Sequence, residues 1–117
     1  MIQKRTLAGR SVSAVGLGCM SFGGIFGATT HADSMACLDK AHDLGIDHLD
    51  VAEIYGDGVC EQVIGDWLKQ TKADVSIATK AGIYMGERPP YKNDEASLRG
   101  SLEGSLRRLG RDHVELF

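Results

Sequence analysis

Polar and apolar residues alternate at Ser11, Val12 and Ser13, and segment 2–18 around them has the pattern of a β-hairpin. The turn of this hairpin is expected at Ala8, Gly9 and Arg10. A short strand over residues 14–17 should follow and lead into the glycine-rich segment 18–27. The pattern therefore predicts antiparallel structure first and a separate strand after it.

The first helical pattern begins after this glycine-rich segment. Thr30 is a good N-cap, and Asp33 lies three residues further on in an imperfect capping box. Gly45 supplies the stop signal at the other end. The apolar residues recur at helical spacing, so the predicted buried stripe consists of Met35, Leu38, Ala41 and Leu44.

Strands and helices then alternate to the end of the chain. Strands are predicted over 46–51 and 75–79, helices over 59–70 and 94–109, and a fourth strand begins within 113–117. Such alternation implies right-handed crossover units and a parallel sheet. Closed barrels and open doubly wound sheets are both built in this way, so periodicity leaves the choice between them open.

The predicted helix over 94–109 carries two further signals. Gly100 and Gly104 are four residues apart, a spacing that favours close helix packing. The basic cluster over 106–111 is offset by neighbouring acidic residues, so we expect a solvated helix end.

Composition excludes several classes of function. The chain has 117 residues, 43% of them hydrophobic, which is enough for the small core of one domain. Its net charge of -3 argues against nucleic-acid binding. No apolar run approaches the roughly 20 residues of a membrane span, and the N-terminus lacks a secretory signal, so a cytoplasmic protein is expected. The three cysteines and four histidines show no metal-ligand spacing, so we expect buried free thiols and no metal site.

Three residues with chemical potential stand at or just after predicted strand ends. Asp50 and Lys80 close two strands and Tyr55 follows the first of them. If these strands are neighbours, their ends lie about 5 Å apart and the three side chains can converge. A lysine beside a tyrosine stabilises the phenolate and makes the hydroxyl a better acid, and a carboxylate keeps that lysine charged. Strand ends also meet water, so spacing alone leaves an incidental arrangement open. Glu53 and Asp57 are expected to be a solvated loop residue and a turn residue.

Other nucleotide-binding signals are absent. The "GLG" segment at 16–18 lacks a third glycine at the required offset, where Ser21 stands, so the dinucleotide fingerprint of an open Rossmann sheet fails.

The segments "VGLGCMSFGG", "HLDVAEIYGDGVCEQVIGDWLK", "SIATKAG" and "SLEGSLRRLGRDHVELF" together resemble the opening part of the aldo-keto reductase family. The "YGDG" element resembles the branch with potassium-channel β subunits and bacterial broad-substrate reductases. The resemblance implies an α/β fold, the N-terminal portion of a (β/α)8 TIM barrel. In this interpretation residues 1–117 are one incomplete domain, in which hairpin 1–13 precedes about three βα units and the start of strand 4 over 14–117.

The resemblance also implies an activity, the reduction of aldehydes or ketones by hydride transfer from NADPH. Tyr55 would protonate the carbonyl oxygen, Lys80 would favour loss of that proton, and Asp50 would hold Lys80. Cys19 and Met20 match positions that line the nicotinamide end of the NADP(H) site, with Asp50 near the ribose. A small-molecule carbonyl substrate is the expected partner.

The chain departs from the family pattern at its end. The fourth catalytic residue, a histidine, would lie beyond Phe117, and His113 cannot replace it. A complete barrel needs about 250 residues, so the chain alone is expected to be inactive. One alternative is a truncated non-catalytic module that self-associates or binds a partner through open strand edges and an uncovered apolar barrel interior. Another is an unrelated open-sheet binding module, which a reversal of strand order would indicate.

Overall fold

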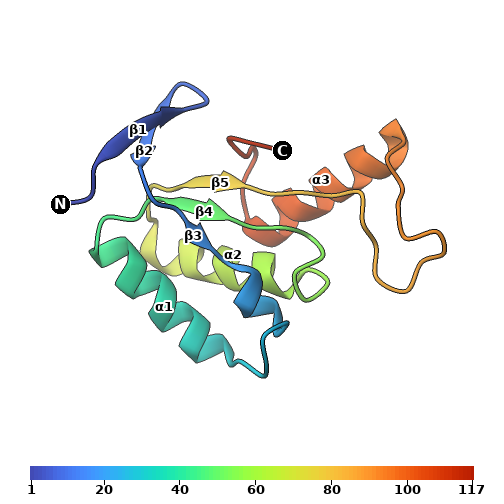
Figure 1. The fold of residues 1–117 in the computed structure, drawn as a ribbon, viewed down its shortest axis with the longest axis horizontal. Helices are drawn as coiled ribbons and strands as arrows, with labels where there is room; N and C mark the ends of the chain where they lie inside the picture. Colours follow the sequence, from blue (N-terminus) through green and yellow to red (C-terminus); the bar gives the residue numbers. More distant parts are fainter.

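Two small sheets and three α-helices make up the computed structural model, which describes residues 1–117 (Figure 1). In chain order the elements are β1 (Lys4–Leu7), β2 (Arg10–Ser13), β3 (Leu17–Gly18), the 3₁₀ turn η1 (Met20–Gly23), α1 (His31–Asp43), β4 (His48–Asp50), α2 (Val59–Thr71), β5 (Ser76–Ala78) and α3 (Glu95–Leu109). None of the helices is long and apolar enough to span a bilayer.

The first sheet is the predicted hairpin. β1 and β2 pair antiparallel, with Leu7 opposite Arg10. Ala8 and Gly9 both have positive φ, 49° and 77°, as a two-residue turn between twisted strands requires. Arg10 was predicted in the turn but already belongs to β2. Asp47, at the amino end of β4, accepts the backbone N–H of Ser13 at 2.6 Å, which ties the hairpin to the second sheet.

The second sheet is parallel and is ordered β3-β4-β5, and its strands point toward the same end of the molecule in Figure 1. Leu116 adds a parallel bridge to Ala78 on the free edge of β5. Neighbours in the sheet therefore follow the order of the chain without reversal. This order contradicts the open-sheet alternative and supports a curving part of a barrel.

The first parallel strand begins later than predicted. The backbone N–H of Ala14 donates to the carbonyl of Gln3 at 2.8 Å, so this part of the chain continues the hairpin pairing. Only Leu17 and Gly18 pair with β4.

The helix boundaries agree with the sequence signals. The Thr30 side chain accepts the backbone N–H of Asp33 at 3.1 Å and caps α1. Asp94 caps α3 in the same way through Ser97, at 3.0 Å, and Gly110 ends the helix with a left-handed φ of 66°. The prediction that Leu44 is buried is wrong, because α1 ends before it and the residue is 56% exposed.

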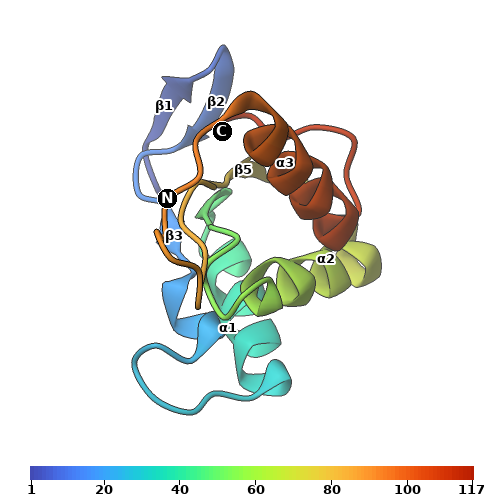
Figure 2. The ribbon, with the colours of Figure 1, turned by 90° about the vertical axis from the view of Figure 1, so that its right-hand side faces the viewer.

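The core lies between the parallel sheet and the helices. Figure 2 shows α1, α2 and α3 in sequence along an arc on the outer side of the strands. Leu49 of β4 and Ile77 of β5 face these helices and are fully or almost fully buried. Their main apolar neighbours in the core are Leu38, Val63, Ile64, Trp67 and Leu109.

The opposite face of the same strands is polar. His48 and Ser76 alternate with the buried apolar residues, and His48 Nδ1 lies 3.1 Å from Ser76 Oγ. Asp50 belongs to the same face of β4. A Cβ on Gly16 would lie 2.9 Å from the His48 ring, so this glycine of "GLG" makes room for a histidine. Ala78, opposite Asp50, is the apolar member of this face, so the inner face of β4 and β5 is largely polar rather than apolar as expected.

Close helix packing depends on a glycine that the sequence signal missed. A Cβ on Gly65 of α2 would lie 2.0 Å from the carbonyl oxygen of Arg108 in α3. Gly104 instead faces the guanidinium of Arg108, and Gly100 has nothing within 4 Å. The predicted packing role of Gly100 is wrong.

Candidate active site

The three residues singled out from the sequence meet at the carboxyl ends of β4 and β5. Asp50 is the last residue of β4 and pairs with Ala78 of β5. Lys80 follows Ala78 by two residues. The pairing continues past the strands, since the backbone N–H of Glu53 donates to the carbonyl of Lys80 at 3.2 Å. The loop that carries Tyr55 therefore starts beside Lys80.

Lys80 connects the other two side chains. Its ammonium Nζ donates to the Asp50 carboxylate, to the Val51 carbonyl at 2.7 Å and to the Tyr55 hydroxyl oxygen at 3.2 Å. The ammonium also lies 4.9 Å from the centre of the Tyr55 ring. About half of the Lys80 and Asp50 side chains remains exposed, so the group is open to a ligand.

The charge of Lys80 is stabilised in place. Partial burial disfavours the ammonium, but the hydrogen bonds to Asp50 and Tyr55 and the nearby negative charge outweigh it, and the pKa of Lys80 is raised. Lys80 is therefore protonated at neutral pH. The site holds a cation, a carboxylate that compensates it, and a phenol whose hydroxyl oxygen contacts the cation.

Tyr55 is held by the backbone of its own loop and by η1. A Cβ on Gly23 of η1 would lie 2.4 Å from the backbone nitrogen of Gly56 and 2.5 Å from the carbonyl carbon of Tyr55. The two segments therefore touch backbone to backbone, which only glycine permits. Asp57, with a left-handed φ of 52°, is a turn residue as expected.

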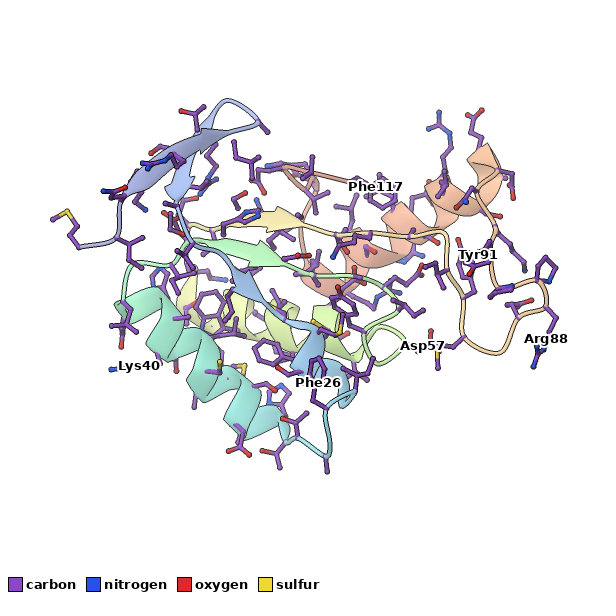
Figure 3. The ribbon with its side chains drawn as sticks, in the orientation of Figure 1. Phe26, Lys40, Asp57, Arg88, Tyr91 and Phe117 are labelled. Atoms are coloured by element: carbon purple, nitrogen blue, oxygen red, sulfur yellow. The ribbon has the colours of Figure 1, made fainter.

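Two hollows adjoin Tyr55. The larger has a volume of about 570 Å³, and its apolar lining side chains are Met20, Ile25, Ile54 and Met85. The smaller, of about 280 Å³, lies between Tyr55 and Lys80. Figure 3 places Asp57, which lines the larger hollow, at the end of the molecule to which the strands point. Apolar walls thus surround a hydroxyl group that is paired with a cation.

The two proposed nicotinamide contacts differ in placement. Met20 lines both hollows. Cys19 is fully buried in the core, and its thiol lies 3.4 Å from the carbonyl oxygen of Leu17 rather than in a hollow. Contact with Cys60 and burial raise the pKa of the Cys19 thiol, which therefore stays protonated. Cys37 is exposed, contrary to the expectation of three buried thiols.

A buried ion pair next to the site was not anticipated. Glu61, in the first turn of α2, is fully buried and accepts hydrogen bonds from Thr79 at 2.6 Å and from Arg108 at 2.7 Å. Arg108 Nη2 also lies 3.4 Å from Glu53 Oε1. Glu53 and Arg108 were expected to be solvated, and both are largely buried partners instead. The available signal was a glutamate on the apolar face of α2, between Cys60 and Val63.

Comparison with known proteins supplies the remaining observations. The sequence profile described as the aldo/keto reductase family matches residues 14–117. The aldo-keto reductase yakc [NADP(+)] of Schizosaccharomyces pombe is 33% identical over 121 aligned residues, which cover 99% of this chain and 36% of that protein.

Solved structures agree with this match. Aldo-keto reductase AKR11C1 from Bacillus halodurans, in its holo form, superposes with a TM-score of 0.81 at 32% identity, over 97% of this chain and 38% of that one. An aldo-keto reductase from Klebsiella pneumoniae in complex with NADPH gives 0.71 at 29% identity, over 89% and 34% of the two chains. The chain thus spans little more than a third of the length of the relatives it matches, and its fold is the N-terminal portion of their (β/α)8 barrel.

Proposed function

The chain belongs to the aldo/keto reductase family, and we propose that it forms the N-terminal part of an oxidoreductase that reduces aldehydes or ketones with NADPH. The single observation that carries this proposal is the 3.2 Å contact between the Lys80 ammonium and the Tyr55 hydroxyl, supported by Asp50. The contact joins a proton donor to a group that stabilises the donor after the proton has left.

Tyr55 acts as the general acid in this proposal. Its hydroxyl donates a proton to the substrate carbonyl oxygen as that oxygen gains negative charge. The Lys80 ammonium then faces the phenolate, and Asp50 keeps the ammonium in place and charged. Apolar side chains line the hollow beside Tyr55, so a substrate bound there would displace water from around its carbonyl group and strengthen these charge interactions.

The residues present fit one end of a nicotinamide cofactor. Met20 forms an apolar wall beside Tyr55, and the half-exposed Asp50 carboxylate can accept a hydroxyl of a ribose. When bound, NADPH would supply the hydride that reaches the carbonyl carbon. The choice of NADP(H) is supported by relatives whose names or structures carry NADP(+) or NADPH.

The test uses a polypeptide that contains this chain together with the rest of a barrel. We expect NADPH oxidation, followed by absorbance, with at least one member of an aldehyde and ketone panel. No oxidation with any member would contradict the proposal. The 117-residue chain alone should bind NADPH weakly and turn over little or no substrate, and tight binding in a fluorescence titration would contradict this second expectation.

A second candidate function rests on the open edges of the parallel sheet. β3 is an edge strand, and Leu116 and Phe117 at the other edge are each about half exposed. Unpaired edges invite association with another copy or with a partner chain. Sedimentation at micromolar concentration distinguishes the two functions, because a well-folded monomer would count against self-association.

A further inference from the structure

A buried charge cluster lies directly behind Lys80 and takes no part in the proton transfer described above. Glu61 is fully buried, and each of its carboxylate oxygens has one partner. Oε1 accepts from the Thr79 hydroxyl at 2.6 Å, and Oε2 accepts from Arg108 Nε at 2.7 Å. A buried carboxylate without partners is strongly unfavourable, so the loss of either partner would destabilise this arrangement.

The cluster controls the residue before Lys80. Thr79 is 2% exposed, and its hydroxyl donates to Glu61 on the helix side of the sheet. Neighbouring residues of an extended chain point to opposite sides. Holding Thr79 toward the helices therefore directs Lys80 to the polar inner face, where Asp50 lies.

The same cluster reaches both ends of the loop that carries Tyr55. Arg108 Nη2 lies 3.4 Å from Glu53 Oε1, two residues before Tyr55. A Cβ on Gly58, three residues after Tyr55, would lie 2.9 Å from Arg108 Cδ. The arginine thus packs against the end of the loop as closely as a glycine allows, and it pairs with the beginning of the loop.

We propose that Glu61, Thr79 and Arg108 are positioning residues that hold Lys80 and the Tyr55 loop in mutual contact. Their relevance to catalysis rests on the function proposed above, whereas their effect on the geometry of Lys80 does not. The cluster links α2, α3, the end of β5 and the loop after β4, so a shift in one element is opposed by the other three.

The experiment measures Lys80 rather than turnover. ¹⁵N-labelled lysine allows the Lys80 ammonium to be titrated by NMR, with Lys80→Met assigning its resonance. Thr79→Val keeps the shape and charge of the site but removes the hydroxyl. Because Lys80 then loses its fixed contacts with Asp50 and Tyr55, its pKa should fall from its raised value toward about 10.4. Thr79→Ser restores a hydroxyl and should restore the raised value.

Ser76→Ala is the matched control. Ser76 is a buried hydroxyl residue of β5 that bonds His48, away from the cluster. Its replacement should cost about as much stability as Thr79→Val but leave the pKa of Lys80 unchanged. An unchanged Lys80 pKa in Thr79→Val, or an equal fall in Ser76→Ala, would overturn the proposal.

Arg108→Lys provides an independent variant if Thr79→Val does not fold. It preserves net charge but loses the forked contact with Glu61 and Glu53. The Lys80 pKa should again fall, and an unchanged value would contradict the proposal. The titration requires no turnover, so it tests the positioning role separately from the proposed function. If the Lys80 pKa falls in Thr79→Val and in Arg108→Lys but the unsubstituted protein oxidises no NADPH, only the proposed function is refuted.

Discussion

The Lys80 ammonium lies 3.2 Å from the Tyr55 hydroxyl oxygen and 4.9 Å from the centre of the same ring. One cation therefore contacts the oxygen of a single phenol directly and lies close to its ring. Both contacts become more favourable when the hydroxyl loses its proton, because negative charge then spreads over the oxygen and the ring. This relationship leads to the first two predictions.

Tyr55→Phe should remove most of the turnover of a barrel that contains this chain, while cofactor affinity changes little. The change deletes only the hydroxyl, and a positioned general acid contributes about 10²–10⁴-fold to rate. Steady-state NADPH oxidation and a binding titration measure the two quantities. Tyr84→Phe is the control, since its hydroxyl lies 2.8 Å from Ser101 Oγ and is outside the site. Unchanged turnover in Tyr55→Phe would show that the assigned role is wrong.

Lys80→Met should lower the free energy of unfolding at neutral pH, and this difference should disappear at strongly alkaline pH. Burial opposes the charge of Lys80, but its hydrogen bonds raise its pKa in the folded state. The stabilisation is therefore complete below the unfolded value of about 10.4 and is lost as pH rises through the higher folded value. Urea unfolding of both proteins from pH 7 to 11 tests this sign. A stability difference that grows with pH would contradict it.

Gly65→Ala should destabilise the chain, because the new Cβ would meet the Arg108 carbonyl oxygen at 2.0 Å and push α2 away from α3. Overpacking of this kind costs about 1–3 kcal/mol. The matched control is Gly100→Ala, a helical position with nothing within 4 Å, which should gain about 0.5–1 kcal/mol from helix propensity. Urea denaturation measures both changes. Equal effects of the two substitutions would be incompatible with this packing.

Glu115→Gln should reduce stability at neutral pH and flatten its acid dependence. Burial disfavours the Glu115 carboxylate, but the backbone N–H of Ile77 and the charge of Arg111 outweigh burial and lower its pKa. Stability from this group is present above the unfolded value of about 4.3 and is lost as pH falls through the lower folded value. Unfolding curves from pH 7 to 3 measure this loss. Glu103 is exposed and serves as the control, so Glu103→Gln should change the free energy of unfolding little at any pH.

Most of the fold and the central contact could be predicted from the sequence because their signals are local. Thr30 and Gly110 mark helix ends through caps that involve only neighbouring residues. Asp50 and Lys80 could be expected to meet because strand ends of a parallel sheet share one edge. The position of Tyr55 in the loop after the first of these strands made it a candidate, and its role as an acid came from the resemblance to the family.

Residues whose environment depends on distant segments could not be predicted in this way. Glu61 and Arg108 are 47 positions apart, and each has the charge of an ordinary surface residue until the other is placed beside it. Gly65 gives no sign in the sequence that the α3 backbone lies against it. The polar inner face was missed for the same reason, since Ser76 and His48 form a pair only after β4 and β5 align.

This polar face has a consequence for synthesis on the ribosome. A nascent chain folds from its amino-terminal end, so the first strands of a longer barrel meet water before later ones emerge. The exposed Asp50 and the partly exposed His48 offer hydrogen-bonding groups to that water instead of an apolar surface. The inner face of an early folding intermediate built on these strands therefore does not promote aggregation. The unpaired strand edges remain available to pair with the strands that follow.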